Sequence, residues 1–259
     1  ESLAQELSRH ESDLSALLAG QRDWPQRRHS LQIALRDDAV VVSDTPGVAQ
    51  PRPGTQVIGA LRKEVGAARH DIMVATPFFV PSGSDVEWYG QLVEHGVRIR
   101  VLTNSLASNP GTVSNSGLQK ERAALLRAGV ELHELRTDAA VKPDYEVGPT
   151  VGDCLGLHAK LYVIDRTRTF LGSVNLDPRS KYLNTEMGVV IDNTELAGEA
   201  ADDVVALMAP ENAWEVTLDP NGRLRWRNDV EVVRRQPARS SGQRLADLIF
   251  GLLPVRGYL

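Results

Sequence analysis

Short apolar runs alternate with longer amphipathic stretches between residues 57 and 133, and this rhythm restricts the fold more than any other feature. The apolar runs predict β-strands at 72–75, 97–102 and 130–133. The stretches before them have helical spacing and predict helices over 57–68, 85–94 and 117–127. Strands that alternate with helices of this length indicate βαβ units. We therefore predict an α/β fold, with a mostly parallel mixed sheet flanked by helices on both faces.

The remaining predicted elements lie on both sides of this region. Further strands are expected at 31–35, 39–43, 158–165, 169–172, 187–192, 214–218 and 224–227. Further helices are expected at 1–20, 195–208 and 244–253. Three prolines and two glycines make residues 45–54 the best candidate for a connector. We therefore divide the chain into a first segment, 1–54, and a larger domain, 55–259.

The last predicted helix carries its apolar residues on one side, namely Leu245, Leu248, Ile249, Leu252 and Leu253. We expect that side to face the core. A basic region precedes the helix and leaves contact with anionic lipid headgroups open as an alternative. Its residues are Arg225, Trp226, Arg227, Arg234 and Arg235.

The composition excludes several classes of protein. A total of 29 Lys and Arg against 34 Asp and Glu gives a net charge of −5, which disfavours a generic nucleic-acid binder. The single cysteine, Cys154, excludes an intrachain disulfide. No apolar run approaches the ~20 residues of a membrane-spanning helix, and no spacing of His, Cys and carboxylates predicts a metal site. Because the chain begins at Glu1 without Met, we expect a piece of a longer protein.

The chemistry of the chain is expected at the strand 158–165. His158 and Lys160 are two residues apart, so in a strand both side chains project from one face. An ammonium group beside an imidazole suits a phosphate, because the cation binds the anionic oxygens while the imidazole attacks phosphorus or transfers a proton. Asp165 lies an odd number of residues from His158, so we expect it to face the other way and to have a structural or orienting role.

Polar residues after neighbouring strands are candidates for the same site. Gly172 lets the backbone approach a ligand, and Ser173 and Asn175 then offer donors to phosphate oxygens. Glu186 is a candidate partner for an imidazole nitrogen. Asn104 follows a strand that is expected to be parallel, at the edge where α/β sheets bind ligands, and a simple turn is an equal alternative there.

This pattern resembles the HKD signature of the phospholipase D superfamily, which reads His-x-Lys, four residues, Asp, six residues and Gly-Ser. The residues in register with it are His158, Lys160, Asp165, Gly172, Ser173 and Asn175. The resemblance extends to the bacterial cardiolipin synthase branch and covers residues 55–259 through several segments. These segments are 76–81, 96–106, 125–132, 175–180 and 184–186. One of them contains Arg179, which is a further candidate for phosphate binding or a solvated cation.

The resemblance implies a phosphatidyltransferase or phosphodiesterase that acts on phospholipid through a phosphohistidine, without a metal or other cofactor. It implies a peripheral protein at the cytoplasmic face of the membrane. The implied catalytic residues are His158, Lys160, Asp165 and Glu186. The implied substrate-binding residues are Ser173, Asn175, Asn104 and Arg179.

One departure from the family pattern concerns the number of motifs. Members of this branch carry two HKD motifs, whereas no other histidine of this chain is followed by Lys two residues later. The chain is therefore similar to the C-terminal half of a two-motif enzyme, and we expect it to be inactive without a second half. That half would be a missing N-terminal part or a second copy, and whether His158 is the nucleophile or the general acid stays open.

Two alternative functions belong to other classes. A homodimeric single-motif nuclease would need a basic groove, which the net charge disfavours, although residues 22–28 form a local basic patch. A non-catalytic half-domain for dimerisation or lipid binding is the other alternative, and the complete motif counts against it.

Overall fold

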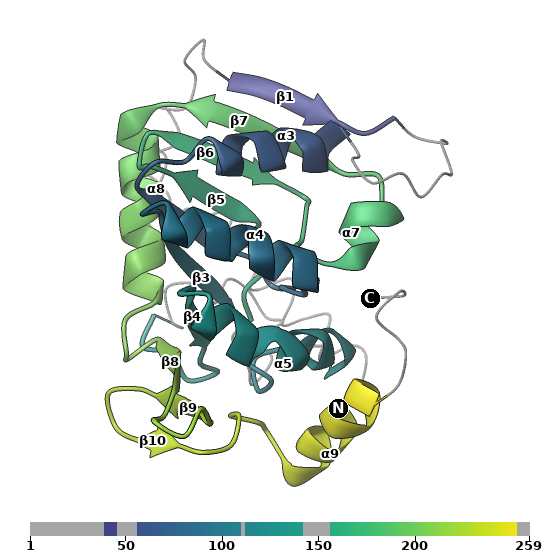
Figure 1. Cartoon of the computed structure of the whole chain (residues 1–259), viewed down its shortest axis with the longest axis vertical. Helices are drawn as coiled ribbons and strands as arrows, with labels where there is room; N and C mark the ends of the chain where they lie inside the picture. Colours follow the sequence, from purple (N-terminus) through teal and green to yellow (C-terminus); the bar gives the residue numbers. More distant parts are fainter. Residues whose placement is uncertain (1–38, 46–55, 110–111, 142–155, 253–259) are drawn as a thin grey trace, which may run out of the picture.

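The computed structural model describes residues 39–45, 56–109, 112–141 and 156–252. The ten strands in these ranges form one open sheet in the order β1-β7-β6-β5-β2-β3-β4-β8-β9-β10 (Figure 1). Several predicted features lie outside the described residues. They are the helix 1–20, the basic patch 22–28, the strand 31–35, most of the connector 45–54 and Cys154.

Parallel pairing is confined to the centre of the sheet. β2 (Asp71–Ala75), β3 (Arg98–Asn104) and β4 (Glu131–Leu135) run parallel, as the alternating helices predicted. All other neighbours among the described strands pair antiparallel. These strands are β1 (Ala39–Ser43), β5 (Leu161–Ile164), β6 (Arg168–Gly172), β7 (Met187–Asp192), β8 (Ala213–Leu218), β9 (Leu224–Arg227) and β10 (Val232–Val233).

The mixed α/β sheet is therefore confirmed, but the expectation that it is mostly parallel is wrong. The physical reason is the length of the connections. Short loops join β5 to β6 and β8 to β9, and a short loop can connect only antiparallel neighbours. Parallel strands need a crossover, and between β2 and β4 the helices α4 and α5 provide it.

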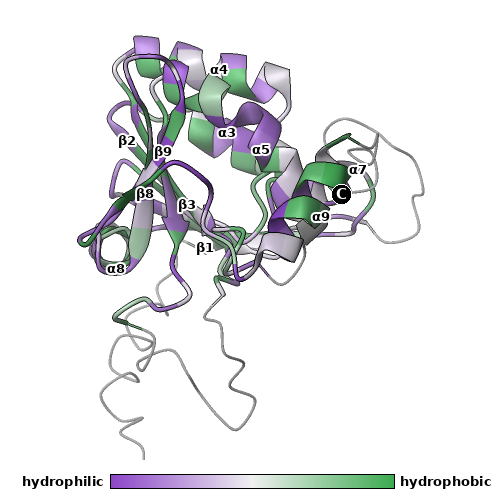
Figure 2. Cartoon of the chain, turned by 90° about the horizontal axis from the view of Figure 1, so that it is seen from below, coloured by the Kyte–Doolittle hydropathy of each residue, from purple (hydrophilic) through white to green (hydrophobic). Residues whose placement is uncertain are grey.

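Helices cover both faces of the sheet, as predicted (Figure 2). The helices on one face are α3 (Gln56–Gly66), α4 (Gly83–Glu94) and α5 (Thr112–Arg127), and α8 (Thr194–Leu207) lies on the other. Alternate residues of β2 serve the two faces. Ile72 and Val74 pack into the core beneath α3, α4 and α5, whereas Met73 and Ala75 pack with residues of α8.

The first described strand continues the sheet across the boundary expected at residue 54. β1 pairs with β7 at the sheet edge. Asp44 follows β1, and its carboxylate accepts hydrogen bonds from the Val57 N–H at 3.2 Å and from the Glu186 N–H at 3.1 Å. Residues 39–45 therefore pack against the larger domain, close to a predicted site residue.

Three short or terminal elements differ from the prediction. α7 (Pro178–Tyr182) and β10 were not predicted, because segments this short carry no periodic signal. α9 (Ser241–Leu252) was predicted as a helix, but its orientation is not the expected one. Its apolar side is exposed and Asp247 is buried, so the expectation that the apolar side faces the core is wrong. Polar contacts between Asp247 and α5 turn the opposite side inward.

Candidate functional site

His158 and Lys160 lie immediately before β5 rather than within it, in the extended segment 156–160. Lys160 Nζ lies 3.2 Å from His158 Nδ1 and 2.9 Å from the carbonyl oxygen of His158. The two side chains are thus side by side, as strand geometry predicted. His158 is exposed and Lys160 is half-buried. A phosphodiester from outside the chain therefore has access to an imidazole and an ammonium group together.

Asn104 holds the backbone directly before His158. Its Oδ1 accepts a hydrogen bond from the Leu157 N–H at 2.8 Å, and its Nδ2 donates to the Leu157 carbonyl at 3.1 Å. Asn104 is the last residue of β3 and is only 2% exposed. The side-chain amide of Asn104 thus bonds to both backbone groups of Leu157, as the backbone of a neighbouring strand would. This geometry suits a residue that positions His158 rather than one that contacts substrate.

Ser173 and Glu186 form a second pair. Ser173 Oγ donates a hydrogen bond to the Glu186 carboxylate and accepts one from the Met187 N–H at 3.0 Å. The other carboxylate oxygen of Glu186 accepts a hydrogen bond from Asn184 Nδ2 at 3.1 Å. Gly172 permits this approach, because a Cβ at that position would overlap the Met187 carbonyl oxygen. The buried Glu186 carboxylate is therefore held by partners on two sides.

The two pairs share one electrostatic environment. The Gly172 N–H donates a hydrogen bond to the Lys160 carbonyl at 3.2 Å, which brings the ends of β5 and β6 together. Burial lowers the pKa of Lys160 below its ordinary value, and the carboxylates of Glu186 and Asp177 oppose that shift. Burial raises the pKa of Asp177, the Ser180 N–H lowers it, and Glu186 raises it further. An arriving phosphate would meet a cation that has already lost part of its hydration.

The segment after β6 is fixed by its own polar contacts. Asp177 caps α7, because its Oδ1 accepts a hydrogen bond from the Ser180 N–H at 2.8 Å and Pro178 follows in the first turn. Ser180 Oγ in turn accepts a hydrogen bond from the Asn175 N–H at 3.2 Å. Asn175 Oδ1 is buried and has no hydrogen-bond partner among the described residues. The backbone at Asn175 is thus held in place while its side-chain amide keeps spare hydrogen-bonding capacity.

Lys181 anchors α7 to α4. Its ammonium group pairs with the Asp85 carboxylate, and both side chains are largely buried. Asp85 also pairs with Arg62 at 3.2 Å. Burial alone would raise the pKa of Asp85, but the charge and hydrogen bond of Lys181, together with hydrogen bonds from Ser82, lower it below its ordinary value. This ion pair fixes the helix that carries the capped segment next to the site.

Asp165 lies at the opposite end of β5 from His158. Its carboxylate accepts hydrogen bonds from the backbone N–H groups of Arg69, His70 and Asp71 at 2.9, 2.7 and 2.9 Å. Burial raises the pKa of Asp165, but these three bonds together lower it below its ordinary value. The expected separation from His158 is present, and the contacts give Asp165 a structural role between β5 and the start of β2.

The predicted site residues therefore fall into two groups. The structure brings His158, Lys160, Ser173 and Glu186 together at one end of β5 and β6. Asn175 follows two residues after Ser173, on the segment that leads to α7. Arg179 is exposed on the neighbouring helix α7, whereas Asn104 lies behind the site and Asp165 lies away from it. Sequence reasoning missed Asp177, Lys181 and Asp85. Only the Asp-Pro pair at the start of α7 carried a signal, since it is typical of a helix N-terminus.

Two kinds of feature are absent from the described residues. No three His, Cys, Asp or Glu side chains within these ranges gather closely enough to hold a metal ion. No helix in the described part of the chain has both the length and the apolar character that crossing a membrane requires.

Known proteins with similar sequences include cardiolipin synthases. Residues 61–207 match the family described as cardiolipin synthase, PLD-like domain, where PLD stands for phospholipase D. The chain is 36% identical over 201 residues to cardiolipin synthase C of Escherichia coli (strain K12), covering 75% of the chain and 42% of that protein. It is 28% identical over 178 residues to cardiolipin synthase A of Serratia proteamaculans (strain 568), covering 68% of the chain and 32% of that protein. The chain thus spans less than half the length of these relatives.

Solved structures with some likeness in fold are more distant in sequence. One is the phospholipase D family member Nuc from Salmonella typhimurium, with a TM-score of 0.46 and 19% identity, covering 65% of this chain and 93% of that one. Another is the phosphatidylserine synthase of Haemophilus influenzae Rd KW20, with a TM-score of 0.48 and 13% identity, covering 70% of this chain and 44% of that one.

The match to a PLD-like domain, in a chain with a mixed α/β sheet, identifies a phospholipase D-like protein. Within that class, the chain belongs to the cardiolipin synthase PLD-like domain family, whose match covers more than half of its residues.

Proposed function

We propose that this chain supplies one half of the active site of a phosphatidyltransferase of the cardiolipin synthase type, acting on phospholipid. The observation that carries the proposal is the contact of the exposed His158 with the half-buried Lys160, beside the Ser173–Glu186 pair. It occurs in a chain whose relatives include cardiolipin synthases C and A. A phospholipid substrate requires contact with a membrane, and we propose that the protein makes this contact peripherally, on the cytoplasmic face.

The proposed reaction consists of two displacements at phosphorus. In the first, a histidine nitrogen bonds to phosphorus, the bond from phosphorus to the leaving alcohol breaks, and a second histidine donates a proton to the departing oxygen. In the second, the acceptor alcohol loses its proton to that second histidine and attacks phosphorus, and the phosphorus–nitrogen bond breaks. His158 supplies one of the two imidazoles, either as the nucleophile or as the acid–base group.

The other residues follow from this scheme. Lys160, Ser173 and Asn175 bind the phosphate oxygens, and the exposed Arg179 extends the positive charge outward. Glu186 orients an imidazole, in its own half or in the opposing one. Asn104 and Asp165 are positioning residues in this proposal, because their side chains bond to backbone groups on either side of β5. Asn104 thus leaves the substrate-binding set that the family resemblance implied.

The second imidazole has to come from another half, because this chain carries one His-x-Lys pair. Exposed apolar side chains lie on the segments that carry the Ser173–Glu186 pair. They are Leu171, Tyr182, Leu183 and Met187. Apolar side chains gathered beside a polar site are typical of a protein interface. We assign this surface to the second half, which is either another part of a longer polypeptide or a second copy of the chain.

The experiment compares the 259-residue chain with a longer protein that contains it, using phosphatidylglycerol and measuring diphosphatidyl and free-headgroup products. The mass of each species in solution is measured in parallel. We expect little turnover by a monomer and robust turnover where two halves are present, and we expect that turnover to persist in excess chelator. Exchange of Arg166 for Gln serves as a control, because this exposed arginine pairs with Asp202 on α8, away from the site.

Three results would contradict the proposal. The first is robust turnover by a proven monomer that His158→Ala abolishes, since it would remove the need for a second imidazole. The second is a reaction that chelator stops and Mg²⁺ or Zn²⁺ restores. The third is cleavage of DNA with no reaction of lipid, which would favour the nuclease alternative.

A further inference from the structure

α9 has the reverse of the usual amphipathic arrangement. Leu245, Leu248, Ile249 and Leu252 follow each other at helical spacing and are 58%, 54%, 49% and 79% exposed, whereas the buried residue of the helix is Asp247. We call these four side chains the α9 stripe. The helix buries its aspartate and exposes its large apolar side chains. An exposed row of apolar side chains is typical of a surface that contacts a partner.

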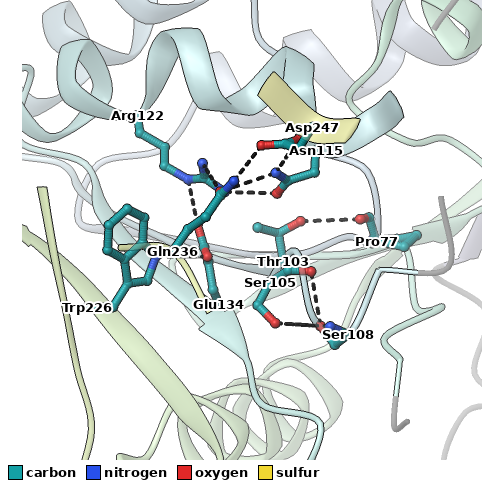
Figure 3. Close-up of polar contacts among 10 residues, drawn as sticks. All are labelled: Pro77, Thr103, Ser105, Ser108, Asn115, Arg122, Glu134, Trp226, Gln236 and Asp247. Atoms are coloured by element: carbon teal, nitrogen blue, oxygen red, sulfur yellow. Dashed lines mark hydrogen bonds and ion pairs between the residues drawn. The ribbon is translucent and has the colours of Figure 1, made fainter. Parts of the chain in front are cut away.

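A closed polar network determines this orientation. Asn115 Nδ2, on α5, donates a hydrogen bond to Asp247 at 2.8 Å, and Gln236 donates a second bond to the same carboxylate. The fully buried Arg122 donates to Asn115 and to Gln236, each at 2.9 Å, and to Glu134 at 2.7 Å (Figure 3). Rotation of the helix to bury its leucines would leave these groups unpaired, so the outward direction of the stripe is specified by the fold.

A groove of about 540 Å³ adjoins the stripe and is lined by arginines. It is formed by α5, β9, the segment after β10 and α9, and Leu248 belongs both to the groove and to the stripe. The arginines are Arg122, Arg223, Arg225, Arg234, Arg235 and Arg244. The lining includes no Asp or Glu, although the whole chain has a net charge of −5.

The arginines differ in how far the protein already neutralises them. Arg122 and Arg225 pair with Glu134 and Asp219. Arg234 and Arg235 are exposed, and neither side chain has a hydrogen bond or ion pair within the described ranges. Two free guanidinium groups at the rim of a groove without acidic residues suit phosphate oxygens, which they can bind in a bidentate manner.

We propose that the groove and the α9 stripe together dock the chain on a membrane that contains anionic phospholipid. Arg234 and Arg235 bind headgroup phosphates while the stripe enters the interfacial region, as amphipathic helices do at membrane surfaces. A nucleic acid would satisfy the arginines but would leave the row of leucines in water. A membrane as the partner agrees with the proposed phospholipid substrate. The inference rests on the proposed function only for this agreement, because the groove and the stripe are observed independently of it.

The location of α9 agrees with this assignment. Figures 1 and 2 both show α9 and α7 at the same end of the sheet, where the parallel strands finish. α7 follows directly after the segment that carries Ser173 and Asn175. A membrane against α9 would therefore lie on the side of the molecule to which the exposed His158 belongs.

The test measures co-sedimentation of the full chain with phosphatidylcholine vesicles, with and without phosphatidylglycerol. Arg234→Gln with Arg235→Gln removes the free charges, and Leu245→Gln with Ile249→Gln removes half of the stripe while keeping good helix formers. The matched controls are Lys63→Gln with Arg69→Gln, which remove two exposed charges elsewhere, and Val40→Thr with Val41→Thr, which change exposed apolar residues of β1. Thermal melts confirm that each variant folds. If the stripe variant melts early, Leu252→Gln replaces it, because Leu252 is the most exposed member.

We expect the chain to bind the vesicles that contain phosphatidylglycerol and to dissociate as salt is added. The arginine variant should bind about 30-fold more weakly, since each basic residue at an anionic surface contributes a factor of about five. The stripe variant should bind at least tenfold more weakly, and both controls should bind like the unchanged chain.

Two outcomes overturn this inference. One is no difference between the two kinds of vesicle or between the variants and the unchanged chain. The other is salt-sensitive binding of duplex DNA that requires Arg234 and Arg235 but not the stripe, which would assign the groove to nucleic acid. Turnover of a short-chain lipid in detergent, measured with the longer protein in which two halves are present, separates this test from that of the proposed function. Vesicle binding by a two-half protein that shows no turnover contradicts the function and leaves the docking surface standing.

Discussion

The Arg122 cluster and the His158 site contain similar polar groups and use them in opposite ways. Arg122 is completely buried, and its three nitrogens each have an acceptor, on Glu134, Gln236 and Asn115. His158 is exposed, the ammonium group of Lys160 contacts only His158 within the described residues, and Asn175 Oδ1 has no partner there. A charge removed from water must be fully bonded, whereas a site for an outside ligand has to keep spare capacity. Hydrogen-bond completeness, rather than charge, separates the structural cluster from the candidate site.

The largest expected effect is on turnover at the open site. In the longer protein or an active dimer, His158→Ala should lower the rate of phosphatidyl transfer by about 10²–10⁴-fold, and by more if His158 is the nucleophile. The melting temperature should stay unchanged, because the side chain is exposed. Steady-state rates and thermal melts on the same preparation check both points. A near-normal rate would remove His158 from the reaction.

The buried cluster should show the reverse pattern. Arg122→Met leaves the Glu134 carboxylate buried without its cation, and we expect a loss of about 3–5 kcal/mol in the free energy of unfolding. Arg98→Met is the matched control, since the Arg98–Glu131 pair is on the surface and should contribute less than about 1 kcal/mol. Urea denaturation measures both variants. Equal losses would mean that burial does not distinguish the two ion pairs.

Asn104 combines features of the Arg122 cluster and the His158 site, because it is buried like Arg122 but bonds to the backbone directly before His158. Asn104→Ala leaves the N–H and carbonyl of Leu157 without their partner and should cost about 1–3 kcal/mol of stability. Turnover per folded molecule should fall about tenfold or more, because the backbone before His158 loses its support. Retention of full turnover by the folded fraction would show that Asn104 has only a structural role.

The smallest expected effect is the pH dependence at Asp165. Its pKa is lower in the folded protein than in the unfolded chain, so the unfolded chain binds the proton more readily. The stabilisation by Asp165 is therefore complete above the ordinary pKa of an aspartate and is lost as the pH falls through the lowered value in the folded protein. Asp165→Asn replaces one of the two oxygens that accept these N–H groups by an amide donor and should cost about 1 kcal/mol at neutral pH. The difference from the unchanged chain should shrink in acid. Urea midpoints at several pH values measure it, and a constant difference would contradict the assignment.

Much of the site could be predicted because its central residues are close together in sequence. The extended backbone places His158 and Lys160 side by side. Asp165 lies apart from them because it follows β5 at its other end. The contacts of the supporting residues were not predictable. Asn104 bonds to a residue 53 positions away, and Lys181 pairs with Asp85 across 96 positions. No local pattern identifies such partners.

The sequence by itself determined the helices and strands around the parallel centre, the helices on both faces and the His-x-Lys pair, because periodicity and residue spacing act over a few residues. Only the tertiary structure decided that most of the sheet is antiparallel, that Asn104 bonds to the backbone of Leu157, and that α9 presents its leucines outward. The pattern of α9 indicates that one side is apolar, but it does not say which side finds a partner. The buried side of α9 is determined by the hydrogen bonds that Asp247 accepts from Asn115 and Gln236, and these bonds exist only once α5 and α9 lie together.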